Sequence, residues 1–139
     1  MAVKSDVSTL DPALSYDSGS MPYVRVLYRG LIDYGAGADF VNAVAKERKV
    51  SPDGKVYSFK LRTDVRFHSG RRVVAEDFRY AVERVLTPAT ASDGFAFYQI
   101  IDGAPEFSAD KKKPKSKQRI EHVRGIRVTG DDEISFTLK

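Results

Sequence analysis

The sequence predicts an α+β domain in which an antiparallel sheet of about four strands carries helices packed on one face. Two observations support this prediction. Apolar and polar residues alternate at Val56–Leu61 and again at Glu133–Leu138, as they do in half-buried strands. Apolar residues at helical spacing follow Ala75, and nothing in the order of the elements has the β-α-β rhythm that a parallel sheet requires. A chain of 139 residues is long enough for one such domain with a core.

The start of the chain differs from the rest. Residues 1–20 are polar and rich in Ser and Asp, with one clear turn at Asp11-Pro12. They predict an extended lead-in, followed by a single α+β domain over residues 21–139. The first element expected in that domain is a helix over residues 23–31, because its apolar residues are spaced by three and four and Gly30 stands near its end.

A short undecided stretch and a turn come next. Residues 40–45 are too few and too mixed to choose between a helical turn and a strand. The turn Ser51–Gly54 has Pro where φ is fixed and Gly where a positive φ is tolerated. It leads into the strand Val56–Leu61, whose aromatic residues and Leu61 share one face.

The helix after Val74 has the clearest pattern in the chain. One face carries the apolar stripe Phe78, Ala81, Val82, Val85 and Leu86. Acidic residues in its first turn complement the helix dipole. Val74 offers no side-chain oxygen to the free amides, which predicts a weak helix start. We expect six residues of the strand and the helix to share one core: Tyr57, Phe59, Leu61, Phe78, Val82 and Val85.

Shorter elements complete the chain. Residues 95–101 predict a short helix, and residues 104–109 a second one. Residues 120–128 and 133–138 both alternate, and the turn Gly130–Asp132 between them predicts a hairpin.

The net charge of +4 comes from one segment. Lys111–Lys117 contains five lysines, which leaves a net charge of −1 for all other residues. A basic run of this kind can bind nucleic acid or acidic partners, which would make the chain an independent binding or adaptor domain. Pro114 and Ser116 break any helix here and no aromatic residue interleaves. We therefore favour a solvated loop and expect no nucleic-acid partner.

The sequence offers little for catalysis. The chain has no cysteine, which excludes disulfides, thiolate metal sites and cysteine nucleophiles. His68 and His122 lie far apart and outside any zinc-type spacing. No serine stands in a G-x-S-x-G elbow, and no glycine-rich loop is present to hold a phosphate. We expect neither enzymatic activity nor a cofactor or metal.

Several spaced motifs carry a family resemblance. The run S-x-DGK-x-Y-x-F-x-LR-x-x-V-x-FH-x-G begins at Ser51, and V-x-AEDF-x-Y-x-x-x-R follows it and ends at Arg84. Together with Leu10-Asp11-Pro12 and Ile101-Asp102-Gly103-Ala104, they resemble the family-5 extracellular solute-binding proteins, the dipeptide, oligopeptide and nickel receptors of ABC importers. The resemblance covers nearly the whole chain, in the family's order. Because family members are several times longer, it implies an N-terminal fragment.

The resemblance implies a function and a location. It implies a receptor that captures a peptide, or less often nickel or another small solute, in a cleft between two lobes. Such a receptor is periplasmic, or extracellular as a membrane-anchored lipoprotein. It delivers its ligand to the ABC permease subunits, contacts the membrane only through the transporter, and catalyses no reaction.

The resemblance also implies two ligand-binding segments. In family members the segment after the Leu-Asp-Pro turn runs along the ligand and pairs with its backbone. Here that segment is Ser15–Ser20, with Tyr16 and Ser18 as the expected contacts. The loop after the central helix approaches the ligand in some members, which adds Gly94 and Phe95 to the expected site.

Overall fold

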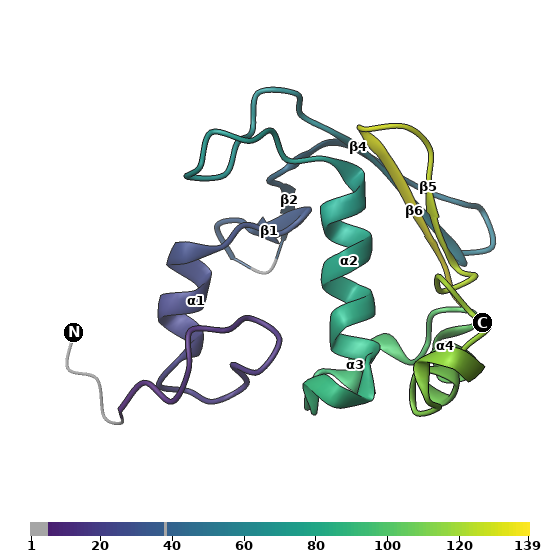
Figure 1. Ribbon diagram of the computed structural model, residues 1–139. Helices are drawn as coiled ribbons and strands as arrows, with labels where there is room; N and C mark the ends of the chain where they lie inside the picture. The colour runs from purple at the N-terminus through teal and green to yellow at the C-terminus, as the bar shows by residue number, and fades with distance from the viewer. Residues whose placement is uncertain (1–5, 38) are drawn as a thin grey trace.

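A four-stranded antiparallel sheet and one long helix form the centre of the fold (Figure 1). The computed structural model describes residues 6–37 and 39–139. The strands lie in the order β3-β4-β6-β5, and the helix is α2 (Ala75–Leu86). The strand bounds are β3 (Ala45–Val50), β4 (Val56–Leu61), β5 (Ile126–Val128) and β6 (Glu133–Thr137). The predicted class, an antiparallel sheet of about four strands with helices on one face, is confirmed.

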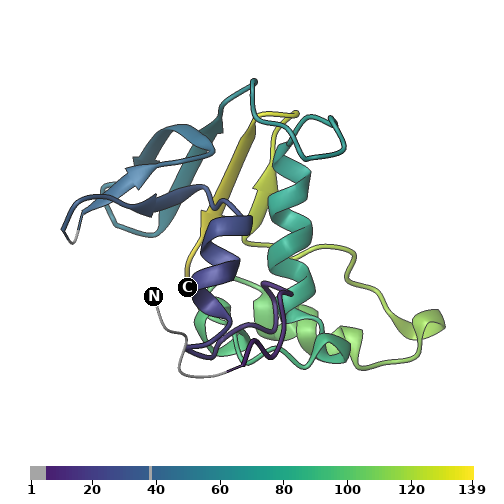
Figure 2. The same ribbon diagram turned by 90° about the vertical axis from the view of Figure 1, so that its left-hand side faces the viewer.

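The core lies between this sheet and the helices. β4 pairs with β6 from Val56↔Thr137 to Lys60↔Glu133, so the two central strands present matching faces. Two short helices, α3 (Phe95–Tyr98) and α4 (Ala104–Lys111), follow α2 on the same side of the sheet (Figures 1 and 2). The buried members of the core are Val44, Leu61, Val73, Ala75, Leu86, Ile101, Ala104, Phe107, Val123, Ile126 and Ile134.

The amino-terminal residues form a separate layer on the far side of α2 (Figure 1). They contain α1 (Met21–Leu27) and a two-stranded antiparallel sheet of β1 (Ile32–Tyr34) and β2 (Phe40–Asn42). Two 3-10 turns, η1 (Pro88–Thr90) and η2 (Lys115–Lys117), complete the elements.

The described part of the lead-in, residues 6–20, is compact rather than extended. A turn at residues 12–14 forms where Leu14 N and Ser15 N donate to the Asp11 carbonyl at 3.0 and 2.9 Å. Ala13, Ser15 and Ser20 are buried. The division of the chain at residue 20 stays a prediction.

Three strand and helix boundaries differ from the predictions. The helix expected over residues 23–31 ends at Leu27, because Tyr28 is already extended with ψ 148°. β3 was not predicted, since it bears four consecutive charged residues and a bulge interrupts its pairing with β4. The strand expected over residues 120–128 begins only at Ile126. Before it, side chains replace strand partners: Ile120 N donates to the Asp110 carboxylate, and Val123 N to that of Glu83.

The predicted core is confirmed in four of its six members. Leu61 is a buried member of the core, and three further residues pack against it: Phe59, Phe78 and Val82. Tyr57 and Val85 are not part of this cluster, although Val85 is buried. The alternation of apolar and polar residues therefore predicted the core residues correctly near the middle of β4 but not at its start.

The backbone amides at the start of α2 have more hydrogen-bond partners than predicted. The Asp77 carboxylate accepts the Val74 amide at 2.9 Å, and Ala75 N donates to the Asp131 carbonyl at 2.7 Å. Asp77 N donates back to the Val74 carbonyl at 3.0 Å. The absence of an oxygen on Val74 is therefore largely offset by its neighbours.

Candidate functional site

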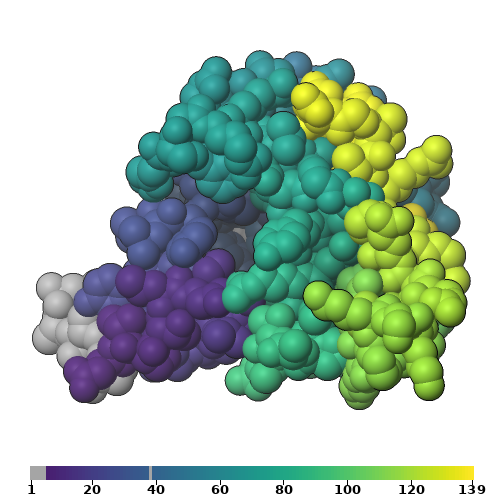
Figure 3. Space-filling model, in the orientation of Figure 1, coloured from purple at the N-terminus to yellow at the C-terminus, as the bar shows by residue number. Residues whose placement is uncertain are grey.

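A groove of about 560 Å³ lies where the amino-terminal layer meets α3. Figure 3 shows another hollow of the surface, between the amino-terminal residues (purple to blue) and α2 (teal), which contributes no lining residue to this groove. The groove is lined by aromatic and other apolar side chains with few charges: Pro12, Ser15, Tyr16, Met21, Val24, Arg25, Tyr28, Gly30, Ile32, Asp33, Tyr34, Phe97 and Tyr98. A concave surface lined mainly by apolar and aromatic side chains is the usual character of a ligand site.

An ion pair fixes the near wall of the groove to α2. The Arg84 guanidinium donates to both carboxylate oxygens of Asp11, to Oδ1 at 2.7 Å. This pairing lowers the pKa of Asp11 to about 2. Asp11 Oδ1 also accepts Ala13 N at 3.0 Å, which closes the turn. The helix and the turn therefore hold each other in position although 73 residues separate them.

A second carboxylate shapes the segment after Tyr16. Asp17 Oδ1 accepts the amides of Gly19 and Ser20 at 2.9 and 2.8 Å, and Oδ2 accepts the Ser8 hydroxyl at 2.6 Å. The bond from Ser8 is the main reason that the pKa of Asp17 is lowered to about 2. The polar residues of this segment thus serve largely to hold its backbone in place.

The two predicted segments meet in space. Ser92 Oγ donates to the Ala13 carbonyl, and Gly94 N donates to Ser92 Oγ at 3.1 Å. Gly94 lies directly against the Tyr16 ring: a Cβ there would be 2.5 Å from Tyr16 Cζ. Glycine at this position therefore leaves the space that the tyrosine occupies. The Tyr16 ring then stacks on Phe97, with centroids 6.0 Å apart.

The polar side chains of the groove are neutral hydroxyls and one ion pair at its rim. Burial raises the pKa of Tyr16 and of Tyr98, so both phenols stay protonated and can donate hydrogen bonds. Arg25 pairs with Asp33 at 3.4 Å and lies over the Tyr34 ring at 5.2 Å. Such a surface can stack on planar or apolar groups and bond to amides.

The four predicted site residues fall in different environments. Tyr16 lines the groove, whereas Ser18 is exposed and does not. Gly94 is buried behind Tyr16, and Phe95 packs against the core. The structure thus brings Tyr16 and Gly94 together and leaves the other two outside the groove.

Sequence reasoning missed most of the aromatic lining. Tyr28, Tyr34, Phe97 and Tyr98 all line the groove, and none was predicted to. One signal was available, since four of the seven tyrosines fall between residues 16 and 34. No group of three or more metal-ligating side chains occurs in residues 6–37 and 39–139. Every helix in that part of the chain is too short or too polar to cross a bilayer.

The basic segment Lys111–Lys117 owes its shape to a buried carboxylate. Asp110 is 2% exposed and accepts the amides of Arg119 and Ile120, both at 2.8 Å. Lys113 Nζ pairs with Asp110 at 2.7 Å, and Lys111 Nζ donates to the Ile120 carbonyl at 2.8 Å. Two of the five lysines therefore serve the loop itself.

The chain is similar to a family of bacterial binding proteins. The model of the bacterial extracellular solute-binding proteins, family 5 (middle part), matches residues 39–139. The dipeptide-binding protein DppE of Bacillus subtilis is 30% identical over 127 residues, 91% of this chain and 23% of DppE. The periplasmic murein peptide-binding protein MppA of Escherichia coli is 31% identical over 101 residues, 73% of this chain and 18% of MppA.

Solved structures agree in fold. The murein tripeptide binding protein MppA of Escherichia coli superposes with a TM-score of 0.82 and 26% identity, over 99% of this chain and 26% of that one. The structure of Listeria monocytogenes OppA bound to peptide gives 0.80 and 28%, over 94% and 25%. The chain thus spans about a quarter or less of the length of the proteins it matches.

Proposed function

Because the chain belongs to the bacterial extracellular solute-binding proteins of family 5, we propose that it forms part of the peptide receptor of an ABC importer. The observation that carries this proposal is the match of the family model to residues 39–139, which hold the sheet, α2 and the loop after it. A free-standing adaptor that uses Lys111–Lys117 has no comparable support. In this proposal the ligand is a peptide, or less often nickel or another small solute.

The proposed ligand site is the aromatic groove. Tyr16 lines it and Gly94 makes room for that ring, while Ser18 and Phe95 lie outside it. An extended peptide can bond to backbone groups of the segment Ser15–Ser20 and stack on the tyrosines. The groove covers one side of a ligand, so we expect weak binding by these residues alone, because the entropy cost of association is undiminished.

Location and partners follow from the same proposal. The receptor works outside the cytoplasmic membrane, in the periplasm or as a lipoprotein. It hands its ligand unchanged to the permease subunits. It converts nothing, so a peptide recovered after binding is intact.

The test is an NMR titration of the ¹⁵N-labelled chain with a pool of di- to pentapeptides. We expect affinities weaker than about 1 μM, with the largest amide shifts at Tyr16, Gly94 and Phe97. Tyr16→Ala removes the stacked ring and is expected to abolish these shifts.

A matched control is Tyr23→Ala. Tyr23 is a tyrosine on α1 that is 41% exposed and does not line the groove. It is expected to bind like the parent. If the peptide shifts lie outside the groove, or persist in Tyr16→Ala, the groove is not the ligand site.

A further inference from the structure

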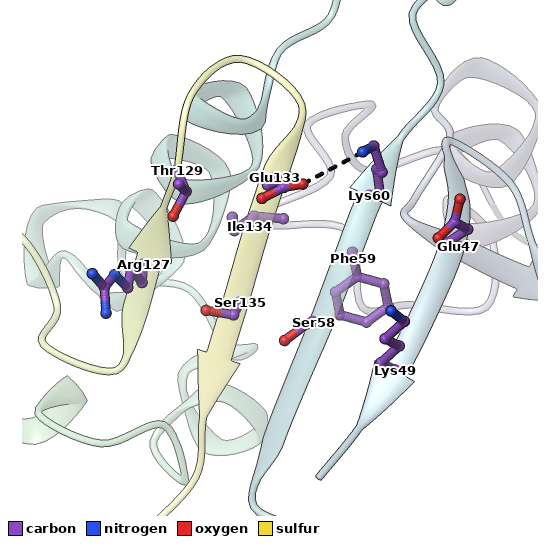
Figure 4. Close-up of a pocket in the computed structure, with 10 residues that line it drawn as sticks. All are labelled: Glu47, Lys49, Ser58, Phe59, Lys60, Arg127, Thr129, Glu133, Ile134 and Ser135. Carbon is purple, nitrogen blue, oxygen red and sulfur yellow. Dashed lines mark ion pairs between the residues drawn. The ribbon is translucent and has the colours of Figure 1, made fainter.

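The sheet has a second hollow, on the face turned away from α2. It encloses about 440 Å³ above the four strands, and Figure 4 shows its lining side chains. Polar and charged residues make up most of its lining. Its two apolar lining residues also belong to the core layer, because Ile134 is a buried core residue and Phe59 packs against the core. The floor of the hollow is therefore backed by a packed core.

Four of the lining residues form one straight row across the sheet. The strand register pairs Lys49 with Ser58, Ser58 with Ser135, and Ser135 with Arg127. We call these four residues the cross-strand row; Figure 4 shows them in sequence from β3 to β5. Three strand spacings separate the backbones of its ends by about 14 Å, so two long cationic side chains flank two short hydroxyls.

The row carries unbalanced positive charge. Within residues 6–37 and 39–139, neither Lys49 nor Arg127 has an acidic partner within 4.0 Å. The third cation of the hollow, Lys60, is paired with Glu133 at 3.6 Å. In the same described residues, neither Ser58 Oγ nor Ser135 Oγ makes a hydrogen bond. The acidic residues Glu47 and Glu133 stand in the neighbouring row, about 7 Å along the strands.

We propose that the cross-strand row binds a small phosphate-type oxyanion. The two hydroxyls donate to its oxygens from the floor, and the ammonium and guanidinium groups neutralise its charge from either side. Such a site is separate from the aromatic groove, and it does not depend on the proposed function. The paired Lys60 and Glu133 lie in the neighbouring row, beside the two hydroxyls.

The test is a titration of the ¹⁵N-labelled chain with sodium phosphate, at constant ionic strength adjusted with sodium chloride. We expect saturable shifts of the Ser58 and Ser135 amides, with a dissociation constant of about 1 mM. Lys49→Gln with Arg127→Gln is expected to weaken binding at least about tenfold, since two charge-assisted bonds are lost. Lys55→Gln removes an exposed lysine outside the hollow and is expected to leave binding unchanged.

A second variant separates a shaped site from general charge attraction. Ser58→Ala with Ser135→Ala keeps every charge and removes both hydroxyls, so we expect binding about three- to tenfold weaker. Unchanged binding in this variant would overturn the proposal, as would equal weakening by Lys55→Gln. Acetate that binds as tightly as phosphate, or no saturable shifts with phosphate, would also overturn it.

Discussion

The two layers of the molecule bury their apolar residues to very different extents. The sheet layer, residues 44–139, contains thirteen of the fifteen buried apolar residues. The amino-terminal layer, residues 6–37 and 39–43, has only Ala13 and Val24 among them. It holds eleven of the sixteen large apolar residues that are exposed, and Val26 is 85% exposed.

This contrast shows that the two layers are stabilised differently. The sheet layer has its own core, which α2 shares with β4 and β6. The amino-terminal layer keeps its shape largely through hydrogen bonds and its ion pair to α2, and an apolar surface of this extent marks a contact face. The predictions below test this contrast, beginning with the largest expected effect.

The same substitution in the two layers is expected to have unequal cost. Leu86 on α2 is fully buried, whereas Leu27 on α1 is 50% exposed. Leu86→Ala leaves a cavity and is expected to lower the free energy of unfolding by about 2–5 kcal/mol. Leu27→Ala is expected to cost less than about 1 kcal/mol. Urea denaturation of both variants measures this, and equal costs would remove the contrast.

A methyl group at the junction of the layers is expected to displace Tyr16. In Gly94→Ala the new Cβ overlaps the Tyr16 ring, so we expect a loss of about 1–3 kcal/mol in stability and of the NOE between Tyr16 and Phe97. The control is Gly94→Ala in a Tyr16→Ala background. There the added methyl meets no ring and only the Ser92 Oγ, at 3.1 Å, so it is expected to cost much less than in the parent background. A similar cost in both backgrounds would place the strain elsewhere.

The Asp11–Arg84 pair is expected to make the junction sensitive to acid. The pKa of Asp11 is lowered from 3.8 to about 2, so its contribution to stability is complete above about pH 5. That contribution is lost as the pH falls through 4 toward 2. Asp11→Asn is expected to lower the free energy of unfolding by about 1–2 kcal/mol at neutral pH, and the difference from the parent shrinks in acid.

Thermal melts of Asp11→Asn and the parent between pH 2 and pH 7 measure this dependence. Asp93→Asn changes an exposed aspartate near the groove and serves as the control. A stability difference between Asp11→Asn and the parent that stays constant down to pH 2 would contradict the assigned role of the pair.

The smallest effect is expected at the start of α2. Val74→Thr adds an oxygen that can accept an amide of the first turn, with a gain of less than about 1 kcal/mol. The gain is limited because the amides of Ala75 and Asp77 already have partners. A midpoint of thermal unfolding equal to or slightly above that of the parent agrees with this. A clear fall would show that the Val74 side chain is needed for packing.

Sequence patterns predicted the fold best for elements that have one apolar face. The periodicity of β4, β6 and α2 reflects one apolar face each, and those elements were correctly placed. β3 pairs through its backbone while most of its side chains are exposed, so it leaves no apolar pattern. The irregular residues before β5 depend on distant carboxylates, those of Asp110 and Glu83, that no local pattern reveals.

The site was predictable only in part. The resemblance gave two segments far apart in the sequence, and the contact between Tyr16 and Gly94, 78 positions apart, shows that they adjoin. Their side-chain directions depend on tertiary packing, which is why Phe95 turned out to face the core. Whether any of the four residues touches a ligand stays a prediction. The aromatic lining comes from Tyr16 before α1, Tyr28 just after it, β1 and α3, and their meeting point depends on the whole amino-terminal layer.

The unpredicted strand β3 also affects how molecules behave toward each other. It is an outer strand of the four-stranded sheet, with one side of its backbone not paired within that sheet. Such a strand can join the same strand of another molecule and begin aggregation. The charged run Lys46-Glu47-Arg48-Lys49 opposes such pairing, because two paired strands would remove these charged side chains from water. The charged residues that make β3 hard to recognise in the sequence thus also help to keep the protein from aggregating.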